Sequence, residues 1–209
     1  HSFTELLQNS PSPSAVNAAI NQGILWHNFR GWIGMSSWSP GSTNNGRKQV
    51  NSVLITCNTG TFYSSYEPSA TEAYLRMGTP MEPNGAVSSI GMCTSSTHTT
   101  FNNILDGGIF YGLYVNNMYT MGEALMSGKY WLWANYQFSQ SDKVTSFSNW
   151  CNQMGDPSMT VWKGIPQEMS PEYSETVSVG DNSMSFTVTD DLTRLPLENT
   201  WITIYANGG

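Results

Sequence analysis

The chain has 209 residues, a length that suits one medium-sized domain and a smaller or incomplete second one. Hydrophobic residues make up 39% and charged residues 11%, so the composition excludes a disordered chain and allows a sizeable core. The formal net charge is −7, and the eight lysines and arginines are scattered, which argues against nucleic acid as a partner. No apolar run approaches the roughly 20 residues needed to cross a bilayer.

Helical and strand-like patterns alternate through most of the chain. Continuous apolar runs predict four buried strands, at residues 24–29, 53–56, 86–91 and 158–162. Helical patterns flank these runs, at about residues 15–20, 68–77, 100–114 and 121–126, the last with an extension toward 133. Ser14 is a candidate cap for the first helix, and the pair Gly107-Gly108 argues against a single straight helix over 100–114. Strands separated by helices predict an α/β domain whose strands share one mostly parallel sheet.

The sequence texture changes from about residue 170. Polar and apolar residues alternate over three stretches, 176–179, 184–189 and 200–205, and Pro166 and Pro171 precede them. This period of two is typical of half-buried antiparallel strands. We therefore predict a separate β unit, distinct from the main sheet and too small for a full sandwich of about seven strands.

The cysteines and histidines are few and scattered. Three cysteines are present: Cys57, Cys93 and Cys151. Three histidines are present: His1, His27 and His98. No two cysteines have Cys-x-x-Cys spacing and no histidine clusters with them, which argues against a structural zinc site. At most one disulfide can form within the chain, and a bridge between Cys57 and Cys93 is one possibility if their strands are neighbours.

Cys57 stands directly after the predicted strand 53–56, and Gly60 follows it three residues further on. Open α/β sheets bind ligands just outside the carboxyl ends of their strands, so this thiol is presented where chemistry is usually done. The alternative is a buried structural cysteine, since free cysteine packs as a small hydrophobe, or half of a disulfide.

Three segments resemble the gingipain-type cysteine peptidases. Residues 57–62 (Cys-Asn-Thr-Gly-Thr-Phe) resemble the nucleophile segment of that family, and residues 28–38 resemble its histidine segment. Residues 155–159 resemble its Gly-Asp-Pro-Ser turn, and the order and spacing of the three segments agree with the family. The resemblance spans about residues 12 to 205, with one departure: Trp32 occupies the position of the catalytic histidine.

The resemblance implies the fold and the domain boundaries. Residues 1–168 would be the histidine-and-cysteine half of a catalytic domain with the caspase-haemoglobinase fold, a mostly parallel sheet with flanking helices. Residues 169–209 would be the start of an immunoglobulin-like β domain, a partial β-sandwich that is incomplete or completed by another chain. The upstream half of the family's catalytic domain would lie before His1, so we expect a fragment or a processed chain.

The resemblance also assigns roles to site residues. Cys57 would be the nucleophile, and the backbone amides of Ile33 and Cys57 would donate to the oxyanion. Trp32 cannot replace the missing base because an indole is only a donor, and loss of a general base costs about 10²–10⁴-fold in rate.

Two histidines remain as substitutes for the base. His98, in the loop after strand 86–91, is the candidate, and the alternative is a solvated loop histidine among Ser and Thr neighbours. His27 lies mid-strand, where a satisfied core histidine is the ordinary interpretation.

These observations predict a secreted gingipain-like domain that has lost catalysis and serves a structural or binding role in a larger surface protein. The alternative is an active cysteine endopeptidase with Cys57 as nucleophile and His98 as base. A third interpretation is an assembly subunit whose terminal β segment pairs across chains. The expected partner is a protein or peptide, either the rest of its own precursor or an identical chain, at an extracellular or cell-surface location. We expect no cofactor; the resemblance alone suggests calcium, and no aspartates have the spacing of a ligand loop.

Overall fold

The structure is a computed structural model that describes residues 12–31, 35, 38–63, 68–163, 168–174, 176, 178–180, 182–198 and 200–204. The chain divides into two compact units, residues 1–164 and 165–209. Each unit is described by itself.

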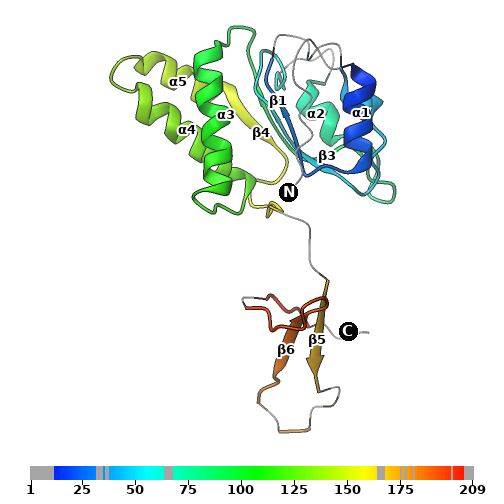
Figure 1. Ribbon diagram of the computed structural model, residues 1–209. Helices are drawn as coiled ribbons and strands as arrows, with labels where there is room; N and C mark the ends of the chain where they lie inside the picture. The colour runs from blue at the N-terminus through cyan, green and yellow to red at the C-terminus, as the bar shows by residue number, and fades with distance from the viewer. Residues whose placement is uncertain are drawn as a thin grey trace. The chain divides into compact units, whose positions relative to one another are not determined.

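The first unit is built on a four-stranded sheet with the order β1-β2-β3-β4 (Figure 1). Its strands are β1 Trp26–Phe29, β2 Val50–Leu54, β3 Ala86–Met92 and β4 Cys151–Met154. The first three strands are parallel, and β4 is antiparallel to β3. All five residues of β2 are buried, because a central strand is covered on both faces. The predicted mostly parallel α/β sheet is therefore confirmed.

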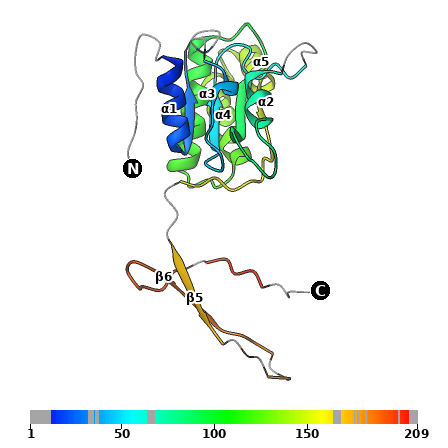
Figure 2. The ribbon, with the colours of Figure 1, turned by 90° about the vertical axis from the view of Figure 1, so that its right-hand side faces the viewer.

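Five α-helices cover the two faces of this sheet. They are α1 Pro13–Gln22, α2 Ala70–Leu75, α3 Thr99–Tyr114, α4 Met121–Tyr136 and α5 Ser141–Trp150. Helices α1 and α2 lie on one side, and α3, α4 and α5 lie on the other (Figures 1 and 2). Two core clusters reflect this division: Val53 and Ile90 pack with α3 to α5, whereas Val50 and Leu54 pack with α1 and α2. A short 3-10 helix, η2 Pro40–Ser42, precedes β2.

The helix starts follow from local capping residues. Ser69 and Glu72 form a capping box at α2, and Thr120 and Glu123 form another at α4. The cap of α1 is Ser12 rather than the predicted Ser14. Pro13 explains the difference, because proline fits the first helical position and so fixes the start one residue after Ser12.

The predicted helix over 100–114 is present as α3, and the glycine pair Gly107-Gly108, which argued against a single straight helix, does not interrupt it. The second glycine is where α4 crosses: a Cβ atom on Gly108 would lie 2.9 Å from the Cα atom of Gly128. Gly108 therefore permits close packing of α3 against α4 instead of ending the helix.

The fourth strand differs from the prediction. Residues 158–162 are not in the sheet, and Thr160 forms only an isolated bridge with Thr120. The sheet is instead completed by β4, which pairs Cys151 with Met92 and follows helix α5. We made no prediction for α5 or β4, because their mixed polar sequences carry no continuous apolar run.

The second unit contains a two-stranded antiparallel sheet of β5 Met169–Tyr173 and β6 Phe186–Asp190, separate from the four-stranded one. Only β6 overlaps a predicted strand; the described residues of 176–179 and 200–205 are not in strands. Pro171 lies inside β5, which is tolerated because proline, lacking an N–H donor, is found on strands with an unpaired edge.

Among the described residues, no helix has both the length and the apolar character required to span a membrane.

Candidate functional site

Cys57 lies in the turn 57–60, just beyond the carboxyl end of β2, and its side chain is half-buried. The turn is held on both sides. The Thr59 hydroxyl donates to the Leu54 carbonyl at 2.5 Å and accepts from the Met92 amide at 3.1 Å. Asn58 has a φ of 60°, a left-handed conformation that asparagine tolerates better than most residues. These bonds fix where the thiol is presented.

A pocket of about 460 Å³ opens beside Cys57 at this edge of the sheet. It lies where the carboxyl ends of β1 and β2, the loop after β3 and the first turn of α3 meet. Its lining is almost entirely polar: Arg30, Gly31, Thr56, Cys57, Ser95, Thr97, Thr99, Asn102 and Asn103. The pocket therefore offers many hydrogen-bonding groups around one thiol.

The Cys57 sulfur contacts a hydroxyl. Its Sγ atom lies 2.9 Å from Thr97 Oγ1, which accepts from Asn102 Nδ2 at 3.0 Å. In the described part of the chain no other residue hydrogen-bonds to this sulfur. The Cys57 amide likewise has no hydrogen-bond partner among the described residues, although the neighbouring Thr56 and Asn58 amides both do. That N–H is thus available to a ligand.

Arg30 places a positive charge at the pocket. Its guanidinium donates to the Ile55 carbonyl and, at 2.6 Å, to Asn103 Oδ1. Burial raises the pKa of the neighbouring Asp106 carboxyl to about 6, while a hydrogen bond from Asn28 and the charge of Arg30 act in the opposite direction. The Arg30 side chain is therefore held in place by contacts from β2 and α3.

Neither of the two described histidines lines the thiol pocket. His98 is exposed at the start of α3, where its Nδ1 accepts from the Thr100 amide at 3.2 Å, and it is not among the residues that line the pocket. His27 is a core residue, as predicted, and burial lowers its pKa to about 4. Trp32 and Ile33 lie outside the described residues.

All three cysteines are free thiols, so the bridge considered between Cys57 and Cys93 is absent. Cys93 Sγ instead accepts from Asn152 Nδ2 at 3.6 Å. Cys151 packs in the core with Trp150, and burial raises its pKa to about 12. In the described residues no group of three or more His, Cys, Asp or Glu side chains could hold a metal ion.

Several pocket residues were not predicted from the sequence. Thr97 lies among the Ser and Thr neighbours of His98 in the loop after β3, and no sequence pattern distinguishes it from them. No sequence pattern marked Arg30 or Asn102 as a pocket residue. Arg30 and Asn102 are 72 residues apart in the sequence, yet both line this pocket. They come together because the parallel strand order brings the end of β1 and the start of α3 to the same edge of the sheet.

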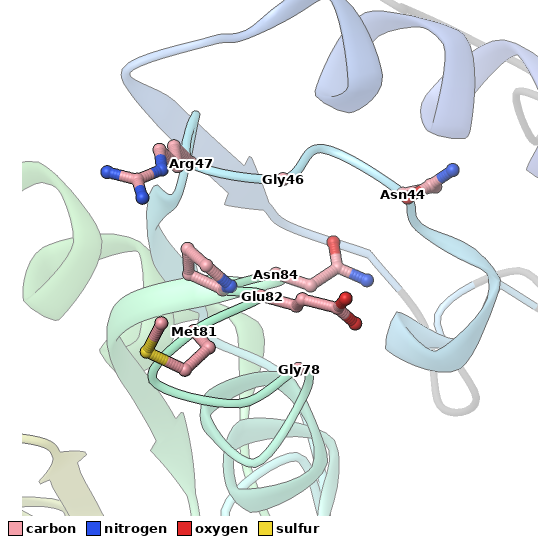
Figure 3. A pocket seen from close by; sticks show the side chains of 8 residues that line it. Asn44, Gly46, Arg47, Gly78, Met81, Glu82 and Asn84 are labelled. Atoms are coloured by element: carbon pink, nitrogen blue, oxygen red, sulfur yellow. The ribbon is translucent and has the colours of Figure 1, made fainter.

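A second pocket of about 490 Å³ lies at the opposite end of the sheet, among the loops that lead into β2 and β3. Figure 3 shows Arg47 on the first loop and Met81 and Glu82 on the second. Asparagines tie these loops together: Asn45 Nδ2 donates to the Gly85 carbonyl at 2.8 Å. The residues that line this pocket include no thiol, hydroxyl or imidazole, so we regard the Cys57 pocket as the candidate site.

The fold and the site together describe a caspase-like α/β domain with a cysteine at the carboxyl edge of its sheet. The model of peptidase family C25 matches residues 3–162. The chain therefore belongs to peptidase family C25, the gingipain family.

Solved structures agree with this assignment of the fold. The Arg-specific cysteine proteinase gingipain R (RgpB) matches with a TM-score of 0.69 at 21% identity, over 87% of this chain and 43% of that one. The complex of the pro- and mature domains of Porphyromonas gingivalis RgpB matches with a TM-score of 0.66 at 20% identity, over 87% of this chain and 44% of that one. A structure described as a protease matches at 0.61 and 13% identity, over 86% and 44% of the two chains. The chain thus spans less than half the length of these structures. No curated protein matches it.

Proposed function

We propose that this chain is a gingipain-like domain that does not hydrolyse peptides and that serves a structural or binding role in a larger surface protein. The observation that carries this proposal is Trp32, which stands where the resemblance places the catalytic histidine. The surroundings of Cys57 support it, because the described partner of its sulfur is the hydroxyl of Thr97 rather than an imidazole. A hydroxyl is too weak a base to take the proton of a thiol at neutral pH.

The alternative is an active peptidase that uses His98 as its base. The Nδ1 atom of His98 accepts a hydrogen bond from the Thr100 amide, so in the neutral ring the proton sits on Nε2. Neither nitrogen is then free to accept a proton from Cys57 unless the helix cap of α3 opens. We therefore rank this alternative second.

A binding role is consistent with what the pocket retains. The Cys57 amide has no described partner and is proposed, with Ile33, to donate to a carbonyl oxygen. Arg30 and the Thr97 hydroxyl add further polar contacts around the same space. Such a pocket suits an extended peptide, whose carbonyl and amide groups need both donors and acceptors. We propose a protein or peptide partner, either from the same precursor or from an identical chain.

The second unit is proposed to be the start of an immunoglobulin-like domain, and the location is proposed to be extracellular or on the cell surface. The separate antiparallel sheet of β5 and β6 supports the first proposal. The structure of a complex between the pro- and mature domains of RgpB supports the proposed protein partner, because there a similar domain binds another protein domain.

The test is a comparison of peptide hydrolysis and thiol labelling. The full chain is incubated with a mixed peptide library and, separately, with a thiol-reactive peptidyl inhibitor at pH 7. We expect no hydrolysis above that of a Cys57→Ala variant, and labelling of Cys57 that His98→Ala leaves unchanged. Hydrolysis that is lost in both Cys57→Ala and His98→Ala would overturn the proposal and establish His98 as the base.

A further inference from the structure

The contact between Cys57 and Thr97 is itself held by a buried side chain. Asn102 is only 4% exposed, and its Nδ2 atom donates to Thr97 Oγ1 at 3.0 Å. Asn102 belongs to the first turns of α3, and its backbone amide donates to the His98 carbonyl at 3.0 Å. The helix that packs against the sheet therefore also sets the position of the Thr97 hydroxyl, which lies 2.9 Å from the sulfur.

The Thr97 hydroxyl can donate its proton to the Cys57 sulfur. A threonine hydroxyl has one proton and two lone pairs. The Asn102 amide occupies one lone pair of Thr97, and no oxygen or nitrogen of another described residue accepts the hydroxyl proton. That proton is therefore free to point at the Cys57 sulfur. A thiolate has no proton to donate, so in that state Thr97 must be the donor, and hydrogen bonds to ionised acceptors are the stronger ones.

We propose that Thr97 is a positioning residue for Cys57: its hydroxyl, aligned by Asn102, orients the sulfur and stabilises its ionised form where no imidazole does so. The inference rests on the proposed function in taking the Cys57 pocket as the working site. It implies that the domain keeps an oriented, reactive thiol even without a general base. An electrophilic group of a bound partner would react with the Cys57 sulfur.

The test is the rate at which Cys57 is alkylated by iodoacetamide between pH 6 and pH 10. The full chain carries Cys93→Ser, because Cys93 is the other partly exposed thiol; Cys151 is buried and is left unchanged. Mass spectrometry identifies the alkylated residue. Thr97→Val removes the hydrogen bond that stabilises the thiolate, so the alkylation rate at pH 7 should fall about threefold. The pH profile should move to higher pH in this variant.

Three further variants make the comparison specific. Thr97→Ser keeps the hydroxyl and should restore the wild-type rate to within about twofold. Asn102→Asp puts a carboxylate beside the Thr97 hydroxyl, which should donate its hydrogen bond to that carboxylate instead of to the sulfur, and should slow alkylation at least as much as Thr97→Val. Ser96→Ala removes a neighbouring exposed hydroxyl outside the pocket and is the matched control.

An unchanged rate and pH profile in Thr97→Val would overturn the inference. So would a slow Thr97→Ser variant, because it would mean that the loop's shape rather than the hydroxyl matters. Peptide hydrolysis by the wild-type chain would refute the proposed function alone, since alkylation needs no general base and its dependence on Thr97 would still be measured.

Discussion

At the scale of single residues, His27 is a titratable side chain in an aromatic environment. Its ring lies edge-on to Trp38 and Tyr74, with centroids 4.7 and 6.0 Å away. Its Nδ1 atom is buried and has no hydrogen-bond partner among the described residues, and burial lowers the pKa of the ring from 6.5 to about 4. The ring is therefore neutral in the folded protein at pH 7 and packs as an aromatic side chain between α2 and the sheet.

This placement predicts a loss of stability in acid. The unfolded chain takes up the proton near pH 6.5 but the folded chain only near pH 4, so the stabilisation is complete above about pH 6.5. It is lost progressively as the pH falls from 6.5 to 4, by about 3 kcal/mol in the free energy of unfolding. Denaturant unfolding at pH 7, 5 and 4 should show this slope.

His27→Leu isolates the effect, because it removes this imidazole and leaves every carboxyl group of the chain in place. The buried Asp106, whose pKa is raised to about 6, acts with the opposite sign and is common to both proteins. Lowering the pH from 7 to 4 should therefore reduce the free energy of unfolding of the wild type by about 3 kcal/mol more than that of His27→Leu. Parallel curves for wild type and His27→Leu would contradict the prediction.

At the scale of elements, the crossing of α3 and α4 depends on residues without side chains. A Cβ atom on Gly108 would lie 2.8 Å from Trp131 Cβ and 2.9 Å from Gly128 Cα. The neighbouring Gly107 has nothing within 4 Å of the same position. Two adjacent glycines in one helix thus have opposite environments.

We predict opposite effects of alanine at these two positions. Gly107→Ala should raise the free energy of unfolding by about 0.5–1 kcal/mol, because alanine is the better helix former and meets no neighbour. Gly108→Ala should lower it by about 2 kcal/mol net, because the helices must separate to admit the methyl group. Chemical denaturation of the two single variants measures both, and equal effects would show that the helices do not pack at Gly108.

The sequence predicted the elements whose burial is continuous. Strand β3 was predicted almost to its bounds, and α3 and α4 were long enough to be found despite their glycines. The predicted strand 53–56 overlaps β2 only at Val53 and Leu54, because the polar residues Asn51 and Ser52 hid its first half. Strand β4 was missed because its four residues, Cys-Asn-Gln-Met, are mostly half-buried and read as polar. Its place is determined by pairing with β3, a long-range contact that leaves no local pattern.

The candidate site was only partly predictable for the same reason. Cys57 was found because it directly follows a buried run, which is a local signal. Thr97 contacts the sulfur, and Asn102 contacts Thr97, only because β3 lies beside β2 and leads into α3 at the same edge of the sheet. When strand order alone brings residues together, their spacing in the sequence follows no fixed pattern, so one sequence does not show that they are neighbours.

At the scale of the whole molecule, the second unit has little to hold it together. Strand β5 leaves four of its five residues exposed, whereas β6 leaves one exposed and buries two. Large apolar side chains of this unit are exposed to solvent: Met169, Tyr173, Val179, Leu192, Leu195, Trp201, Ile202 and Ile204. An isolated two-stranded sheet is marginal in water, and exposed apolar side chains of this number usually meet a partner.

This contrast predicts how the full chain responds to a protease. Limited proteolysis at low protein concentration should first cleave within residues 165–209 and leave a fragment that ends near residue 164, because the first unit has two buried cores. Mass spectrometry of a time course identifies the fragment. If identical chains complete the β unit, raising the protein concentration should slow this cleavage, since association protects by mass action. Cleavage at equal rates in both units would contradict the prediction, because it would mean that the paired strands β5 and β6 are as stable alone as the four-stranded sheet with helices on both faces.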